Sequence, residues 1–439
     1  MSNKELTHRH ILVFWLPLLA TLIMMMAEAP IIASFIARLP DPKYNLAAFG
    51  VAYSIAMFFE SPVIMMLSAS TTLVRDRHSF LVLRRFAYLL NGLITILFVL
   101  ALTPPVYGFF VAGLIGLTHP ISRLTYVACL ILLLWPAAIG YRRFYQGILI
   151  RNDLTRRVSY GTVIRLFSMT LTALFLYFYG EMAGAYVGAA SLSVGVLAEA
   201  IASRLMVNRT IARLLHKDSQ PYQDSPLDFR HLVKFYAPLA ASSMLGLGIR
   251  PVVTFFMGKS LFPIESLAVY PVIYGLVGIF YTFGWSFQEA SIALIGEHLK
   301  NFGKLLTFTL GLGLFAAGGL SIIAFTPLSV VWFQDITGLS SELTGFSIRP
   351  VQAVSIIPFL HVVVSFFIAV LIATKVTKAV IKSTAIEFSI IVLFLFIGIH
   401  HMRMVGIMAA VIALLLGRFS SLAYLSIPLY TGVKGKGSR

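Results

Sequence analysis

Charged side chains lie inside several long apolar segments of this 439-residue sequence. Glu28, Glu60, Arg142, Arg165 and Arg250 each stand several residues within such a run. An ionisable group in the hydrocarbon of a bilayer is costly unless it is paired or hydrated, so it is a functional candidate by default. The arginines could bind an anion, and the glutamates could carry a proton or a cation. The alternative for each residue is a tether between helices or a side chain that snorkels to the interface.

This reasoning gives one set of candidate contacts for a substrate or coupling ion. The set contains seven polar side chains: Glu28, Tyr53, Glu60, Arg142, Arg250, Gln288 and Glu289. Arg143, Glu199 and His361 also lie in apolar segments, and we interpret them as structural.

Five prolines lie inside apolar segments: Pro30, Pro62, Pro136, Pro251 and Pro358. Each lacks a backbone N–H and is expected to kink or break its helix. In a membrane this is tolerated where neighbouring groups or a wet cavity satisfy the freed carbonyls. We therefore expect the segments with Pro30 and Pro251 to line a cavity and to move.

The elements that carry these residues are predicted membrane helices. Of all residues, 59% are hydrophobic and 12% are charged, and the mean hydropathy is +0.89. Soluble domains contain roughly twice that share of charge. Apolar runs long enough to span a bilayer lie near 11–37, 46–74, 86–112, 123–149, 158–180, 183–206, 232–257, 266–295, 304–326, 349–373, 381–400 and 404–430. The sequence predicts an all-α polytopic membrane protein with about twelve transmembrane helices.

The two halves of the chain repeat one another. Arg9-His10 recurs as Arg230-His231 and Pro30 as Pro251 at an offset of 221, and Pro136 recurs as Pro358 at an offset of 222. A shared register of prolines indicates duplication. We predict a six-helix lobe at 1–206, a cytoplasmic linker at 207–229 and a second six-helix lobe at 230–439.

Loop charges predict the orientation. The net charge of +17 comes from basic residues that concentrate in the N-terminus and in every second loop. This bias places both termini in the cytoplasm and argues against a nucleic-acid partner. Six spans per half make the repeat parallel, with a pseudo-two-fold axis along the membrane normal. Two such lobes suit alternating access. We expect a multi-pass protein of a prokaryotic inner membrane, in contact with lipid and monomeric.

Other chemistry is not expected. Gly258-Lys259-Ser260 resembles the end of a phosphate-binding loop, but Val253 occupies the position where that motif needs glycine. No nucleophile–base–acid set is present, so we do not expect an enzyme. We interpret His400-His401 as an interfacial pair rather than a metal site. No cofactor is expected, and coupling to H⁺ or Na⁺ stays open.

Two pairs of charges are related by the repeat. Arg165 and Glu387 occupy equivalent positions with opposite charge. We hypothesise that they face a cleft between the lobes and contribute to closure on the inner side; the alternative is that each pairs within its own lobe. Glu28 and Arg250 precede equivalent prolines and lie at similar depth. We expect both to line the cavity, with Arg250 as an anion contact and Glu28 as its counter-ion or proton carrier.

Three stretches resemble the progressive ankylosis protein family. They are Leu46–Phe59 (LAAFGVAYSIAMFF), Arg75-Asp76-Arg77 and Ile249–Val253 (IRPVV), and Glu28 is similar in position to a glutamate in that family's first span. The chain lacks the long acidic tail of the animal members and resembles a short prokaryotic relative. The resemblance implies a place near multidrug and toxin extruders, polysaccharide-lipid exporters and lipid II flippases. It implies a MATE-like, V-shaped pair of six-helix lobes that exports a solute; animal members are associated with release of pyrophosphate, ATP and citrate-like anions.

Three functions therefore stay open at this stage. Arginines within spans and the resemblance favour secondary export of a small organic or phosphorylated anion. Glu28, Glu60 and Glu289 and the aromatic content favour cation- or proton-coupled multidrug efflux. The third is a flippase for lipid-linked precursors or an assembly role, which requires a lateral portal that sequence does not show.

Overall fold

The computed structural model describes residues 6–113, 115–152, 154–216, 228–295, 299–374 and 376–437. Residues 217–227 of the predicted linker 207–229 lie outside the described residues, whereas residues 207–216 continue the preceding helix and are not a loop. Within the described ranges nearly all residues are helical, and β-type pairing is limited to one isolated bridge between Leu261 and Val405.

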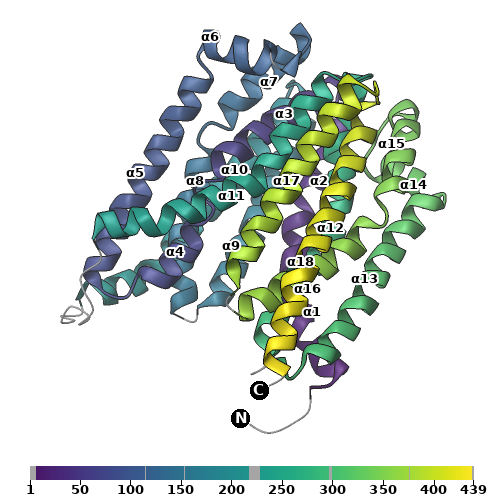
Figure 1. Cartoon of the computed structure of the whole chain (residues 1–439). Coiled ribbons are helices and arrows are strands. Elements are labelled where there is room, and N and C mark those ends of the chain that lie inside the picture. Colours follow the sequence, from purple (N-terminus) through teal and green to yellow (C-terminus); the bar gives the residue numbers. More distant parts are fainter. Residues whose placement is uncertain are drawn as a thin grey trace. The chain divides into compact units, whose positions relative to one another are not determined.

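The helices of the first half follow one another with short connections (Figure 1). They are α1 (His8–Met26), α2 (Glu28–Ala37), α3 (Pro42–Glu60), α4 (Met66–Leu73), α5 (Arg77–Ala101), α6 (Pro104–Val106), the π-helical segment η1 (Tyr107–Gly113), α7 (His119–Ile131), α8 (Trp135–Arg151), α9 (Thr155–Tyr179) and α10 (Gly184–His216).

The second half contains a matching series. It consists of α11 (Phe229–Gly258), α12 (Pro263–Leu294), α13 (Phe302–Phe325), α14 (Leu328–Val330), η3 (Val331–Ile336), α15 (Ser341–Val354), α16 (Ile357–Ala373), α17 (Thr377–His400) and α18 (Gly406–Gly437).

Details of the backbone recur at the repeat offset. Asp41 and Phe262, each followed by a proline, both adopt the left-handed conformation, with φ of 52° at either residue. The π-helical segments η1 and η3 follow equivalent helices. Two elements differ. The first span is divided into α1 and α2 at Ala27, whereas its equivalent α11 is one helix. In addition, α3 and α4 are separated by a turn after Glu60, whereas α12 runs unbroken for 32 residues.

Among the described residues, ten helical segments are long and apolar enough to cross a membrane. The count rises to eleven if α15 and α16, which meet at 41°, form one bent span. The prediction of an all-α polytopic membrane protein is confirmed. The count falls short of twelve because the predicted span 46–74 is divided between α3 and the short α4.

The prolines explain most of the breaks. Pro30, Pro62, Pro136 and Pro358 lie at or just after the ends of α1, α3, α7 and α15, where the missing N–H interrupts the helical ladder. In contrast, α11 passes through Pro251 without a break.

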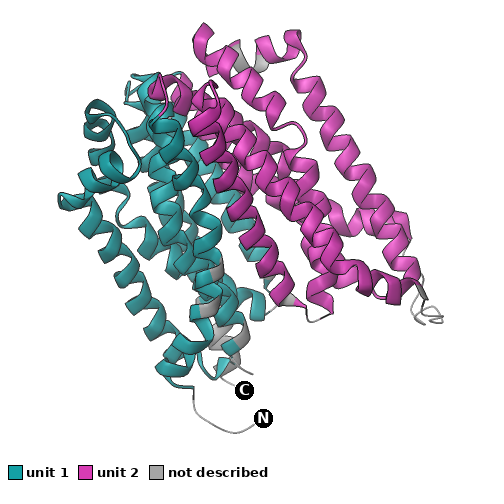
Figure 2. Cartoon of the chain, turned by 180° about the vertical axis from the view of Figure 1, so that it is seen from behind, with its two compact units in different colours: residues 1–38, 259–439 teal, residues 39–258 magenta. Residues whose placement is uncertain are grey.

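Contacts divide the chain into two compact units, which Figure 2 shows in different colours. Unit 1 comprises residues 1–38 and 259–439, and unit 2 comprises residues 39–258. In unit 1, Ile11 and Trp15 of α1 are buried with Phe287 and Phe366. The first span of each half thus packs among helices of the other half.

In unit 2, Tyr236 of α11 is buried with Phe86 and Phe144. The unit boundaries therefore differ from the predicted lobe boundaries. The lobes were inferred from the repeat, and a repeat reports ancestry rather than which helices pack together.

Candidate functional site

A buried charge network links three helices of unit 2. Glu199 of α10 is fully buried. Arg142 of α8 donates a hydrogen bond to its Oε2 atom, and Gln146 of α8 donates to its Oε1 atom at 2.9 Å. Arg165 of α9 places its Nε atom 3.5 Å from the Oε2 atom of the same carboxylate. One carboxylate therefore anchors two arginines of two different helices.

Glycines allow the helices to approach closely at this point. A Cβ atom on Gly161 of α9 would lie 3.3 Å from Cγ of Glu199. A Cβ atom on Gly195 of α10 would lie 3.0 Å from the backbone oxygen of Arg165. Small residues of this kind permit close backbone approach between membrane helices. They bring the charged side chains of α9 and α10 within ion-pair distance.

Glu60 adds a second carboxylate. It is buried and is the last residue of α3, where the helix carbonyls carry partial negative charge. A carboxylate at this end is unfavourable unless a cation or a proton compensates it. Four arginine side chains, Arg143 most strongly, act on Glu60 electrostatically.

Arg143 stands next to Arg142 on α8. Its guanidinium Nε atom is buried and donates no hydrogen bond of normal geometry to the described residues. The side chain as a whole is half-buried. Arg142, Arg143 and Arg165, together with Glu60 and Glu199, give this network a net charge of +1.

Side chains of α11 donate hydrogen bonds to the backbone at the break after Glu60. The hydroxyl of Tyr236 donates to the backbone oxygen of Pro62 at 2.6 Å. The hydroxyl of Ser243 donates to the backbone oxygen of Ser61 at 2.5 Å. Both contacts satisfy carbonyls that the interrupted helix would otherwise leave unpaired. Glu60 is therefore held at a defined position rather than on a frayed helix end.

Two predicted candidates, Tyr53 and Arg250, come together in unit 2. The guanidinium carbon of Arg250 lies 5.3 Å from the centroid of the Tyr53 ring, a cation–π geometry. Its Nη1 atom lies 2.6 Å from Sδ of Met57. Ser54 and Thr254 join α3 and α11 nearby, with 3.0 Å between their hydroxyl oxygens.

The equivalent region of unit 1 has a different character. Tyr281 of α12 occupies the position of Glu60, and its ring lies 4.4 Å from the buried ring of His361. Trp285 packs edge-on against His361 at 5.3 Å. The ionic contact here is between Arg418 Nε and Glu387 Oε1, at 3.3 Å.

The other predicted candidates also lie in unit 1. Glu28 begins α2 and is half-buried, and the positive end of the helix dipole stabilises its carboxylate. Gln288 is half-buried, and Glu289 is exposed on α12. The structure thus brings Tyr53, Glu60, Arg142 and Arg250 into one unit and places Glu28, Gln288 and Glu289 in the other.

Arg165 and Glu387 each form an ion pair within their own half. Pairing within one half is the alternative to a role in closure that the sequence analysis named. The role in closure stays a prediction.

Sequence reasoning undervalued three residues of the network: Arg143, Gln146 and Glu199. A signal existed for Glu199. Arg165 and Glu199 both lie seven residues from the inner end of their predicted spans, so a search for opposite charges at equal depth would have paired them. No comparable signal identified the contacts of Tyr236 and Ser243 with the helix break.

No known protein-family profile matches the chain, and no curated protein matches it. Solved structures do. An inward-facing multidrug resistance MATE transporter of the MOP superfamily superposes with a TM-score of 0.71 at 12% identity, over 96% of this chain and 99% of that one. The chain has the MATE-like fold.

Two further structures show the same MATE-like fold. The lipid II flippase MurJ in an inward closed conformation gives a TM-score of 0.69 at 15% identity, covering 93% of this chain and 87% of that one. A MOP superfamily transporter from Pyrococcus furiosus gives a TM-score of 0.62 at 14% identity, covering 98% of this chain and 99% of that one. Identity at this level establishes the fold and leaves the resemblance to the progressive ankylosis family as a prediction.

Proposed function

We propose that this protein is a secondary membrane transporter that exports a small organic or phosphorylated anion by alternating access. The observation that carries the proposal is the excess of arginine over glutamate in the membrane interior of unit 2. A buried charge is tolerated where an opposite charge or water compensates it. A network with a net charge of +1, with Arg250 on a neighbouring helix, favours an anion as the compensating species.

Arginine suits such a cargo. Its planar guanidinium donates two parallel hydrogen bonds to carboxylate or phosphate, and it stays charged at all physiological pH values. Arg143 and Arg250 are the two residues that we assign to contact the anion. Arg142 and Arg165 anchor the site through Glu199.

We further propose an inner-membrane protein with both termini in the cytoplasm, working as a monomer. Coupling to H⁺ or Na⁺ would use Glu60, because a carboxylate at a helix C-terminus gains from taking up a cation. Glu28 is the second candidate, as counter-ion or proton carrier.

Cation- or proton-coupled multidrug efflux is the second candidate function. It is favoured by the likeness to multidrug MATE transporters and by the buried carboxylate of Glu60. The likeness to MurJ similarly keeps a flippase for lipid-linked precursors open. The Pyrococcus furiosus transporter is described as having a binding pocket of reverse polarity that suggests a different function. That description supports variation of cargo charge within one fold.

Transport by purified protein in liposomes tests the proposal. Pyrophosphate, ATP, citrate and cationic dyes should be compared, with and without gradients of H⁺ and Na⁺. We expect flux of at least one anion. We also expect Arg250→Ala to abolish that flux in a folded protein and Glu28→Gln to change its dependence on pH. Transport of the dyes alone would favour multidrug efflux.

A matched control is Arg213→Gln, which removes an exposed basic residue on α10. Normal anion flux by Arg250→Ala, or its failure to fold, would show that Arg250 is a structural tether.

A further inference from the structure

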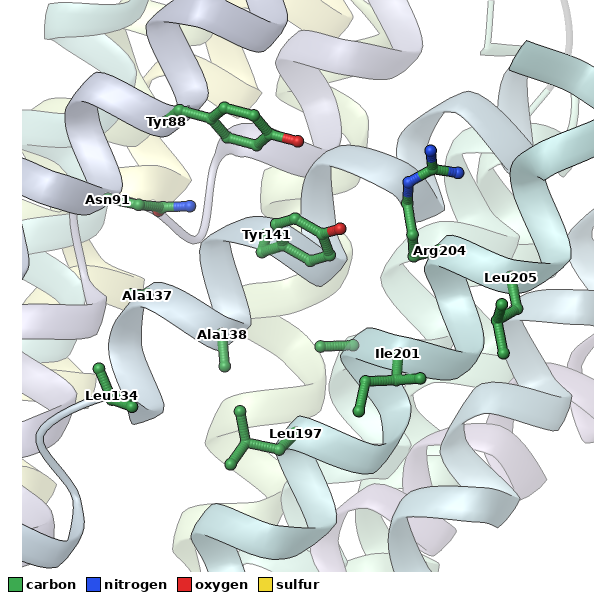
Figure 3. Close-up of a pocket in the computed structure, with 11 residues that line it drawn as sticks. Tyr88, Asn91, Leu134, Ala137, Ala138, Tyr141, Leu197, Ile201, Arg204 and Leu205 are labelled. Carbon is green, nitrogen blue, oxygen red and sulfur yellow. The ribbon is translucent and has the colours of Figure 1, made fainter. Parts of the chain in front are cut away.

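Unit 2 has a groove between α5, α8 and α10 that the transport proposal does not use (Figure 3). Its volume is about 580 Å³, within the range of sites that hold drug-sized ligands. Its apolar part is formed by Leu134, Ala137, Ala138, Leu197, Ala200 and Ile201. The alanines leave the hollow because their side chains are short.

The rim of the groove is apolar and exposed. The rim residues Leu134, Ile201 and Leu205 are 57%, 61% and 63% exposed. They belong to helices of a membrane-spanning chain, so we place these large exposed apolar side chains in hydrocarbon rather than in water. An occupant of this groove must therefore enter from the bilayer and present an apolar chain.

One end of the groove is polar. Arg204 of α10 places its guanidinium carbon 5.2 Å from the centroid of the Tyr145 ring. The Tyr145 hydroxyl lies 2.8 Å from that of Tyr88, and the Tyr88 and Tyr141 rings stack. Figure 3 shows Tyr88 and Arg204 at one end and Leu134 and Leu197 at the other.

The position of Arg204 along α10 matches the level of lipid headgroups. It lies 20 residues after Gly184, where α10 begins, which corresponds to about 30 Å at the rise of an α-helix. That length equals the hydrocarbon thickness of a typical bilayer. Leu197 lies about 10 Å deeper, seven residues earlier. A cation at the interface and an apolar slot leading inward match the layout of a phospholipid.

Asn91 is a second polar feature of the groove. It is 8% exposed, and its Oδ1 atom has no hydrogen-bond partner among the described residues. A Cβ atom on Gly140 would lie 2.1 Å from this oxygen, so the glycine leaves room for the amide. Asn91 stands one helical turn from Tyr88, toward the bilayer centre. Its Nδ2 group can donate to the ester carbonyls just below a phosphate.

We infer that this groove binds an anionic glycerophospholipid of the bilayer. Arg204 and the tyrosine hydroxyls take the phosphate, Asn91 takes the glycerol region, and the slot over Ala137 and Ala200 takes an acyl chain. A basic pocket between membrane helices is a known means of selecting anionic headgroups. The loop charges assign this end of α10 to the cytoplasmic leaflet.

Native mass spectrometry of the whole protein, released from nanodiscs of equal parts phosphatidylcholine and phosphatidylglycerol, tests this inference. We expect retained phosphatidylglycerol in preference to phosphatidylcholine. Arg204→Gln should lower the apparent affinity for phosphatidylglycerol about fivefold, the effect of one basic side chain near a membrane surface. Ala200→Phe should remove retention of both lipids. Arg209→Gln, an exposed neighbour on α10, should leave retention unchanged.

Equal loss in Arg204→Gln and Arg209→Gln would overturn the inference, as would equal retention of the two lipids by the unaltered protein. If a variant does not fold, photo-crosslinking of the unaltered protein decides. A phosphatidylglycerol with a diazirine in its acyl chain should label the 197–205 segment above other lipid-facing segments. Uniform labelling of all exposed helices would mean an ordinary lipid annulus and contradict a defined site.

Discussion

The Arg165–Glu199 pair of unit 2 and the Glu387–Arg418 pair of unit 1 join equivalent helices with opposite polarity. Arginine comes from α9 and glutamate from α10 in one unit, whereas glutamate comes from α17 and arginine from α18 in the other. An ion pair thus joins the same two helices in both halves with its charges reversed, although Arg418 lies three residues before Ser421, the equivalent of Glu199. An ion pair that can be reversed serves to tie two helices together.

The surroundings of the two pairs differ more than the pairs themselves. Unit 2 adds Arg142 and Arg143 on α8, where the equivalent residues of α16 are Val364 and Ser365. It also has Glu60, where unit 1 has Tyr281. The comparison separates a shared tether from charges that only unit 2 carries. We assign function to the charges that only unit 2 carries.

The largest effect is expected from Glu199→Gln. It removes the carboxylate that anchors Arg142 and Arg165 and leaves buried cations uncompensated, at a cost of about 3–5 kcal/mol. Glu387→Gln should cost about 1 kcal/mol or less, because the Arg418 side chain is 20% exposed and can reach water. Thermal unfolding of both variants in detergent measures the difference. Equal losses would contradict the contrast between the units.

An intermediate effect is expected from exchanging charges. Reversing the unit 1 pair, with Glu387→Arg and Arg418→Glu together, should recover most of the stability that each single variant loses. Each single variant places like charges together, whereas the double variant restores attraction. Exchange across the halves, with Arg165→Glu and Glu387→Arg, should be no better than its single variants. Recovery of transport by that exchange would instead support closure by these two residues.

A smaller effect is expected where helix packing differs. Gly147 of α8 corresponds to Ala369 of α16. A Cβ atom on Gly147 would lie 1.7 Å from Oγ of Ser70 and 2.6 Å from the backbone oxygen of Leu67. Gly147→Ala should therefore cost about 1–3 kcal/mol in thermal stability through overpacking of α4 against α8. Gly318→Ala is the control, because no atom lies within 4 Å of its Cβ position.

The smallest effect is expected from His361→Phe. Neither ring nitrogen makes a hydrogen bond of normal geometry among the described residues, and the ring packs against Tyr281 and Trp285. Phenylalanine keeps the ring contacts, so stability should change by less than about 1.5 kcal/mol and transport should persist. Loss of ion coupling in a folded His361→Phe variant would indicate that His361 carries a proton. It would then assign part of the transport function to unit 1.

The sequence predicted the positions of the helices better than the side-chain contacts between them. Apolar runs and loop charges give the spans because lipid demands continuous apolar helices. The prolines indicated four breaks in helices. They did not indicate that the Tyr236 hydroxyl donates to the backbone oxygen of Pro62 at one of these breaks. Repeat offsets paired Arg165 with Glu387, whereas the observed partners lie on neighbouring helices. Side-chain pairing depends on helix rotation and packing, which one sequence leaves undetermined.

Equilibrium binding of pyrophosphate or citrate to purified protein tests the central claim most directly, with Arg143→Gln compared with Arg418→Gln. Arg143 belongs to the charges found only in unit 2, and Arg418 belongs to the tether that both units share. We predict that Arg143→Gln weakens anion binding about tenfold or more, the scale of one charge-assisted contact. Arg418→Gln should bind like the unaltered protein. Undiminished binding by folded Arg143→Gln, or binding of cationic dyes alone by the unaltered protein, would contradict this account.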